Sequence, residues 1–142
     1  MDDSLVIGID PASAKLAIVA LHKEEFAYRT YAKLGPSGGP ACHNAARAVG
    51  RFVQTSIPAS WKSGRLLAFI ESPVVGRGGV RSTMVQCFTS GAVQGVLYGL
   101  GFHTQIANVS SWKKRVVGKG KDRKSTRLNS SHVSESRMPS SA

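Results

Sequence analysis

The first part of the chain alternates between short apolar runs and short polar connectors. The apolar runs cover residues 5–9, 16–21 and 26–31. Runs of this length, bounded by proline, lysine and glutamate, are typical of β-strands. The connectors at residues 11–15 and 22–25 are too short for a helical crossover, so each strand is expected to run antiparallel to the next. The pattern therefore predicts an antiparallel meander of three strands.

The apolar spacing changes after a glycine- and proline-rich loop at residues 35–40. From Ala41 up to the break at Pro58, apolar side chains recur every three or four positions, with basic and amide side chains on the other side. This period predicts one amphipathic helix. Its apolar side comprises Ala45, Val49, Phe52, Val53 and Ile57.

An almost wholly apolar segment at residues 65–71 ends abruptly at Glu71. Such a segment is typical of a strand covered on both faces. A glycine-rich basic loop at residues 72–81 precedes a second predicted helix over residues 82–100. Three glycines fall four residues apart on one stripe of this helix and are expected to let its backbone approach the sheet closely. They are Gly91, Gly95 and Gly99.

The last patterned segments complete the element order. Residues 103–109 predict a fifth strand, and residues 110–121 predict a turn or helix entry with a basic end. The order is then three strands, a helix, a strand, a helix and a strand. This order is typical of an α/β protein in which helices flank a mixed sheet of about five strands.

Size and composition favour one globular domain. A chain of 142 residues with 42% apolar content can bury one core. No apolar run approaches the length of a membrane span, and no basic flank precedes the first apolar stretch, so a cytoplasmic protein with no membrane association is expected. Cys42 and Cys87 lack metal-binding spacing and are expected to be reduced thiols in the core.

The chain is strongly basic, with 19 lysine and arginine residues against 8 acidic ones and a formal net charge of +11. Residues 122–142 contribute four basic and two acidic side chains, so residues 1–121 keep a charge of +9. This charge favours a polyanionic partner, because phosphate contacts release condensed counterions. A basic surface that only confers solubility is the alternative.

Asp10 and Glu71 each stand at the end of an apolar strand. A carboxylate in that position is costly unless something compensates it, and the carboxyl edge of an α/β sheet is where sites are built. If the two strands are neighbours, the paired charges favour a bound Mg²⁺ or Mn²⁺, which suits phosphodiester cleavage. Alternatively, Asp10 caps the turn at Pro11 and Glu71 is a solvated strand end.

Four segments carry a family resemblance, and they occur in family order. They are IGIDPAS at residues 7–13, LLAFIES at 66–72, TSGAVQGVLYGLG at 89–101 and WKKRVVGKGK at 112–121. Together they resemble the RuvC-like Holliday-junction resolvases of bacteria and phages, in the RNase H superfamily. The resemblance covers about residues 4–121 and implies an RNase H-like fold in which Asp10 and Glu71 bind Mg²⁺, with Mn²⁺ as a possible substitute.

The same resemblance implies a nuclease function. It predicts a homodimer that binds four-way DNA junctions in recombination and repair and cuts two strands symmetrically, with a branch-migration motor as a possible partner. A lysine that contacts phosphate is implied at Lys113. The basic candidates for backbone contact are Arg77, Arg81, Lys113, Lys114, Arg115 and Lys119.

Two departures from the family pattern limit what the resemblance implies. Ala12 stands where glycine is common, and Val74 and Val75 stand where several relatives carry an aromatic wedge. Junction opening and sequence preference are therefore left open.

Residues 122–142 have a separate origin in this interpretation. DRKSTRLNSSH at 122–132 and SRMPSSA at 136–142 match the translation of a short-read sequencing adapter on either side of its barcode. The segment is therefore expected to be a non-native, disordered tail that belongs outside the nuclease domain at 1–121. The resemblance implies a second pair of acids on a final catalytic helix, which this chain is expected to lack, so the chain itself is expected to be inactive. A natural serine- and arginine-rich tail that binds nucleic acid is the competing interpretation.

The sequence is also compatible with three other functions. Another RNase H-like nuclease, acting on RNA/DNA hybrids or other branched DNA, needs the same two acids. A non-catalytic DNA-binding module of this fold needs the charge but not the acids. An actin-like nucleotide-binding half domain needs a glycine- and threonine-rich loop after the first strand, and DPASAK at residues 10–15 supplies little of it.

Overall fold

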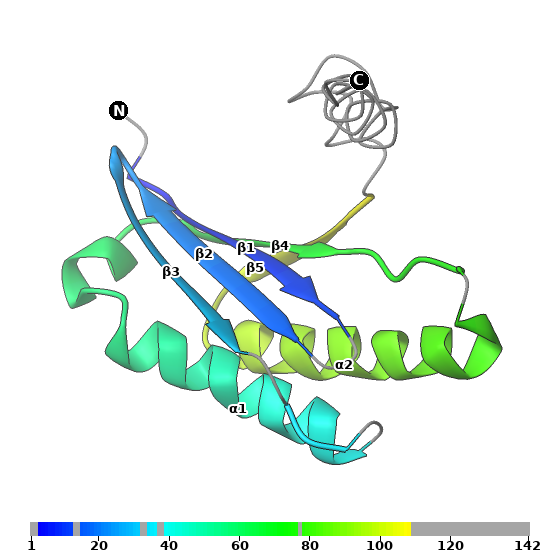
Figure 1. Ribbon diagram of the computed structural model, residues 1–142. Coiled ribbons are helices and arrows are strands. Elements are labelled where there is room, and N and C mark those ends of the chain that lie inside the picture. Colours follow the sequence, from blue (N-terminus) through cyan, green and yellow to red (C-terminus); the bar gives the residue numbers. More distant parts are fainter. Residues whose placement is uncertain (1–2, 13–14, 32–33, 37–38, 77, 109–142) are drawn as a thin grey trace, which may run out of the picture. The chain divides into compact units, whose positions relative to one another are not determined.

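The computed structural model describes residues 3–12, 15–31, 34–36, 39–76 and 78–108 (Figure 1). The predicted order of strands and helices is confirmed, and a short 3₁₀ helix that the sequence pattern did not predict precedes the fourth strand. The elements are β1 (Leu5–Pro11), β2 (Leu16–His22), β3 (Glu25–Tyr31), α1 (Gly39–Thr55), η1 (Ala59–Lys62), β4 (Leu66–Glu71), α2 (Gly79–Gly99) and β5 (His103–Ala107).

The five strands form one mixed sheet in the order β3-β2-β1-β4-β5. β1, β2 and β3 pair antiparallel, as the short connectors predicted. β4 pairs parallel to β1, and β5 pairs parallel to β4. Ile9 of β1 lies opposite Ile70 of β4, so the carboxyl ends of these two strands are neighbours.

Both helices cover the same face of the sheet, and the core lies between them and the strands (Figure 1). Alternate residues of β1, such as Ile7 and Ile9, point into this core because successive side chains of a strand point to opposite faces. The predicted apolar side of α1 is buried there, including Ile57 just beyond the helix. Phe52 is the largest of the fully buried side chains.

The opposite face of the sheet is covered by no element of the described residues (Figure 1). Phe26 and Tyr28 of β3 are 66% and 71% exposed there, and Val19 and Leu21 of β2 are about half exposed. Phe69 of β4 is also exposed on this side. The prediction that β4 is covered on both faces therefore holds for only one face in this part of the protein.

α2 begins at Gly79, three residues earlier than predicted, and places its glycines on the wrong side for the predicted role. Its buried residues are Thr89, Ser90, Val93 and Leu97. Gly91, Gly95 and Gly99 lie on other sides, and a Cβ added to any of them would meet nothing within 4 Å. The prediction that they allow close approach to the sheet is wrong, because small polar and branched residues form the inward side instead.

Cys87 also faces outward, so its assignment to the core is wrong; Cys42 is half-buried. The Cys42 Sγ atom lies 3.3 Å from Thr89 Oγ1, between α1 and α2. No helix of the described residues is long and apolar enough to cross a bilayer.

Candidate metal centre at the carboxyl ends of β1 and β4

The two candidate acids are brought together by strand pairing. Ile9 and Ile70 are register partners in the parallel β1–β4 pair, and Asp10 and Glu71 are the next residue on each strand. Neighbouring strands are about 4.8 Å apart, so the two carboxylates can share one cation. Because both isoleucines are buried on the helix side, the acids that follow them face the open side of the sheet. Asp10 is exposed, whereas Glu71 is half-buried.

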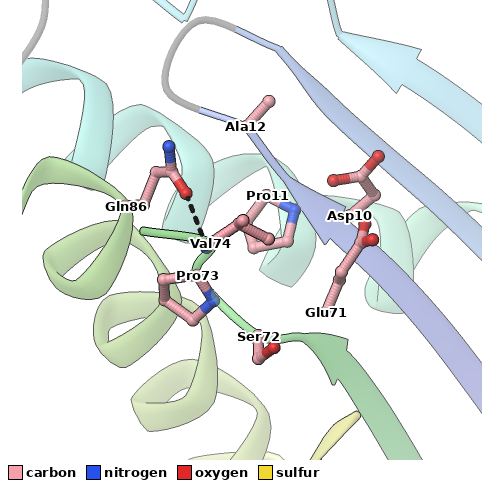
Figure 2. Close-up of a pocket in the computed structure, with 8 residues that line it drawn as sticks. All are labelled: Asp10, Pro11, Ala12, Glu71, Ser72, Pro73, Val74 and Gln86. Atoms are coloured by element: carbon pink, nitrogen blue, oxygen red, sulfur yellow. Dashed lines mark hydrogen bonds between the residues drawn. The ribbon is translucent and has the colours of Figure 1, made fainter. Parts of the chain in front are cut away.

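A pocket of about 240 Å³ lies beside this pair (Figure 2). Its walls come from the end of β1, from the segment that follows β4 and from α2. The carboxylates of Asp10 and Glu71 lie at one end of the pocket, and the Gln86 amide lies at the other, with Pro11 and Val74 between them (Figure 2). The lining residues are Asp10, Pro11, Ala12, Glu71, Ser72, Pro73, Val74 and Gln86.

The donor set at this end of the pocket suits a hard divalent cation. Two like charges on adjacent strands repel each other unless a cation lies between them. Mg²⁺ is commonly held by one or two carboxylates, with water and substrate phosphate completing its coordination, and Mn²⁺ accepts the same oxygen ligands. Within the described ranges, no group of three or more histidine, cysteine, aspartate or glutamate side chains could hold a metal ion. Asp10 and Glu71 are therefore a candidate pair of metal ligands, with no third such side chain beside them among the described residues.

The segment after Glu71 is held in place at three points. The Ser72 N–H donates to the Ala107 carbonyl oxygen at 2.9 Å, which extends the β4–β5 pairing. The Val74 N–H donates to Gln86 Oε1 at 3.3 Å (Figure 2). The Gly79 N–H donates to the Gly76 carbonyl oxygen at 3.2 Å. Hydrogen bonds, rather than apolar burial, therefore position this segment, because the Val74 side chain is itself exposed.

Sequence reasoning did not identify Gln86 or Ser72 as residues of the site. Ser72 follows Glu71 directly, so its place in the site could have been inferred from that of the acid. Gln86 lies 15 positions further along the chain than Glu71 and in a different element. No local pattern around Gln86 distinguishes it from Gln94 of the same helix, so only the packing of α2 beside β1 and β4 identifies it.

One of the predicted DNA-contacting residues, Arg81, lies in the described part of the chain. Arg77, Lys113, Lys114, Arg115 and Lys119 lie outside the described residues. Arg81 is exposed in the first turn of α2 and does not line the pocket.

Solved structures of low sequence identity share this arrangement of strands and helices. RuvC from Thermus thermophilus aligns with a TM-score of 0.56 and 14% identity, over 97% of this chain and 85% of that chain. This is an RNase H-like fold. At 14% identity the likeness establishes the fold alone. No protein-family model matches the sequence, and no curated protein matches it either.

Two further solved structures align with this chain at lower similarity. YeaZ from Pseudomonas aeruginosa aligns with a TM-score of 0.48 and 13% identity, over 81% of this chain and 50% of that chain. The ethanolamine utilization protein EutJ from Carboxydothermus hydrogenoformans aligns with a TM-score of 0.47 and 18% identity, over 81% of this chain and 40% of that chain.

Proposed function

We propose that this chain derives from a Mg²⁺-dependent endonuclease that cuts four-way DNA junctions. One observation carries the proposal: Asp10 and Glu71, identified separately in the sequence, end adjacent parallel strands and line one pocket. The resemblance of the four sequence segments and the RNase H-like fold both support a nuclease of this class. Another nuclease of the same fold is the alternative, because it requires the same pair of acids.

The pocket supports metal-dependent contact with DNA. Without a cation, the two carboxylates repel a phosphodiester, since all three groups are anionic. A divalent cation held by Asp10 and Glu71 would supply Lewis-acid stabilisation of charge on the phosphoryl oxygens. The side chains of Pro11 and Val74 limit the space beside the two carboxylates, where the strand would lie. DNA binding at this site should therefore require a divalent ion.

The charge of the chain supports a DNA partner. The formal charge of +9 on residues 1–121 provides phosphate contacts whose strength falls steeply with salt concentration. We assign contact with the DNA backbone to the six basic residues that the sequence predicted. Of these six, the structure describes Arg81. Contacts of this kind position DNA without reading its sequence, which suits a protein that recognises the shape of a junction.

We further propose that two copies of the protein associate through α2. Large apolar side chains are exposed along its outer surface, and Gly91 and Gly95 leave its backbone open. Val80, Met84 and Phe88 are spaced four residues apart, so they form one stripe. A twofold axis through this stripe would set large side chains of one copy against the glycines of the other. Two copies would also supply two metal pairs, one for each strand cut symmetrically.

Sedimentation of the Phe88→Glu variant tests this association. We expect wild-type protein to dimerise and Phe88→Glu to be monomeric at the same concentration, because the variant places charges at the contact. Phe26→Glu on the open face of the sheet is the matched control, since Phe26 is similarly exposed. Loss of the dimer in Phe26→Glu but not in Phe88→Glu would assign the contact to the sheet face instead.

Residues 122–142 are proposed to lie outside the native protein, on the strength of the adapter match. This is tested by sequencing the source DNA across codon 121. A reading frame that continues into a helix with two further acids supports the proposal. A source sequence that reproduces the serine-rich segment contradicts it and favours a DNA-binding role without cleavage.

Activity is tested on the protein that the source reading frame encodes. We expect Mg²⁺-dependent cutting of a synthetic four-way junction, little cutting of a linear duplex or an RNA/DNA hybrid, and loss of cutting in Asp10→Asn and Glu71→Gln. Preferential cutting of the hybrid would favour the alternative nuclease. The 142-residue chain is expected to bind the junction weakly and not to cut it; metal-dependent cutting by this chain that Asp10→Asn abolishes would show that no further acids are needed.

A further inference from the structure

Gln86 is the α2 side chain that lines the pocket beside the two acids. It enters at the end opposite the carboxylates, and the space between them is bounded by Pro11 and Val74 (Figure 2). The pocket therefore has two anionic acceptors at one end and a neutral amide at the other. An amide can donate and accept hydrogen bonds. The hydrogen bonds that Gln86 already makes within the protein therefore determine whether its oxygen or its N–H groups can bind a ligand.

The oxygen of this amide already accepts one hydrogen bond. Gln86 Oε1 accepts a hydrogen bond from the Val74 N–H at 3.3 Å. The nitrogen of the amide makes a weaker contact. Gln86 Nε2 lies 3.5 Å from Ser82 Oγ, and this distance is longer than that of an ordinary N–H···O hydrogen bond. A primary amide has two N–H groups, and the second finds no acceptor among the described residues. Gln86 therefore retains donor capacity within the pocket.

The two ends of the pocket suit successive parts of one DNA strand. A cation at Asp10 and Glu71 would attract one phosphate, and the strand must then continue along the pocket or leave it. Among the described residues that line the amide end, none carries a negative charge that would repel a second phosphate, and Gln86 has a donor to offer. Pro11, Ala12, Pro73 and Val74 supply no side-chain donor, so Gln86 and the Ser72 hydroxyl are the side-chain donors that line the pocket.

We propose that Gln86 is a contact for the sugar-phosphate backbone of the strand bound at the metal pair. Its Nε2 donates to a phosphate oxygen, while Oε1 keeps the segment after Glu71 in place through the Val74 N–H. The inference rests on the proposed function, because it requires a nucleic acid strand in this pocket. The Gln86 amide is neutral, so this contact would strengthen binding of a nucleic acid strand but not binding of a metal ion alone.

Substitution by glutamate separates the two roles of the side chain. The Gln86→Glu variant keeps an acceptor for the Val74 N–H but replaces the donor with a negative charge. Gln86→Met keeps the approximate length and loses both. If Nε2 contacts the strand, Gln86→Glu should bind DNA less tightly than Gln86→Met. If Gln86 only positions the segment through the Val74 N–H, Gln86→Met should bind DNA less tightly than Gln86→Glu, because only the glutamate keeps the acceptor.

The experiment measures fluorescence anisotropy of a labelled four-way junction with Ca²⁺ at low ionic strength, using the 142-residue chain. We expect the junction affinity of Gln86→Met to fall about tenfold, since a lost hydrogen bond to a charged group has about this effect. The affinity of Gln86→Glu should fall further, because the added carboxylate also repels the phosphate. Gln54→Glu is the matched control for charge. Gln54 is exposed near the end of α1, close to the Val53 carbonyl that Lys62 contacts and away from the pocket. Mn²⁺ affinity without DNA should not weaken in any of the three variants.

Each outcome separates the inference from the function on which it rests. If Gln86→Glu binds no worse than Gln54→Glu, or better than Gln86→Met, the backbone contact is wrong. The proposed function still stands in that case, provided that Asp10→Asn removes the Ca²⁺-dependent part of junction binding. If Asp10→Asn leaves wild-type binding and its metal dependence unchanged, the proposed function fails, and this inference fails with it. Circular dichroism melts confirm that each variant is folded.

Discussion

At the scale of single residues, the two acids owe their placement to strand alternation. Ile9 and Ile70 are buried on the helix side, and the residue after each must face the open side. The sequence could therefore predict both acids as strand ends, but it could not decide whether β1 and β4 are neighbours. That pairing depends on packing of the whole sheet, which no local pattern around either acid contains.

We expect Asp10→Asn to weaken Mn²⁺ binding by about tenfold or more, because it removes one of the two anionic ligands. Without metal, the variant should unfold at an unchanged or higher temperature, since the repulsion between paired carboxylates is relieved. Electron paramagnetic resonance of Mn²⁺ and calorimetric melting measure the two effects. Asp3→Asn, at the opposite end of β1, should leave Mn²⁺ binding unchanged; an equal loss in both variants would mean that Mn²⁺ is attracted only by general charge.

Asp3 provides a pH-dependent contribution at the amino end of β1. A hydrogen bond from Lys23 is the main cause that lowers the pKa of Asp3 below its ordinary value of 3.8, and a hydrogen bond from His22 lowers it further. The His22 ring Nε2 lies 3.1 Å and Lys23 Nζ 3.2 Å from Asp3 Oδ1, and the His22 ring also stacks on Trp61.

Because the pKa of Asp3 is lower in the folded state, its stabilising effect is present above 3.8 and is lost as the pH falls through the folded value. We expect Asp3→Asn to reduce the free energy of unfolding near neutral pH and to make it depend less on pH below about 4. Urea unfolding at a series of pH values measures this. Equal acid sensitivity in the wild type and the variant would contradict the assignment.

At the scale of elements, α1 and α2 show what a hydrophobic period can and cannot predict. α1 has apolar residues on one side only, and the side that was predicted is buried. α2 has apolar or small residues around most of its circumference, so its pattern favours no single side. Its orientation is set by which residues fit against the strands and α1, and the outward position of Gly91 follows from that fit.

Phe52→Ala tests the burial of α1. Removal of a fully buried phenylalanine side chain should lower the free energy of unfolding by about 3–5 kcal/mol. Phe26→Ala, which truncates a mostly exposed ring, should lower it by less than about 1 kcal/mol. Urea denaturation measures both. Similar losses in the two variants would show that the open face of the sheet is covered in solution.

At the scale of the whole molecule, the uncovered face of the sheet is the dominant feature of the described residues. Phe26, Tyr28, Val19, Leu21 and Phe69 expose apolar surface on one side of a single sheet. Apolar patches of this kind mark an interface or a tendency to aggregate. The position of the two acids on this same side means that whatever covers the face also borders the candidate metal site.

We expect the double variant Phe26→Lys, Tyr28→Lys to remain monodisperse at protein concentrations where the wild type aggregates. The added charges oppose association of two molecules through the open face of the sheet or through its edge strand β3. They should not disturb the core, since both side chains are exposed. Static light scattering against concentration measures this. Wild-type protein that stays monodisperse with a sharp, cooperative melt would show that the face does not drive association.

The parallel pairing of β1 with β4 has a kinetic consequence. Leu5 pairs with Leu66, so this contact closes a loop that includes β2, β3 and α1, whereas the β1–β2–β3 meander closes only short ones. Contacts between distant residues form more slowly, because the entropy of loop closure must be overcome first. The meander can therefore form before Asp10 and Glu71 meet, and recovery of Mn²⁺ binding after dilution from urea should lag behind recovery of strand structure.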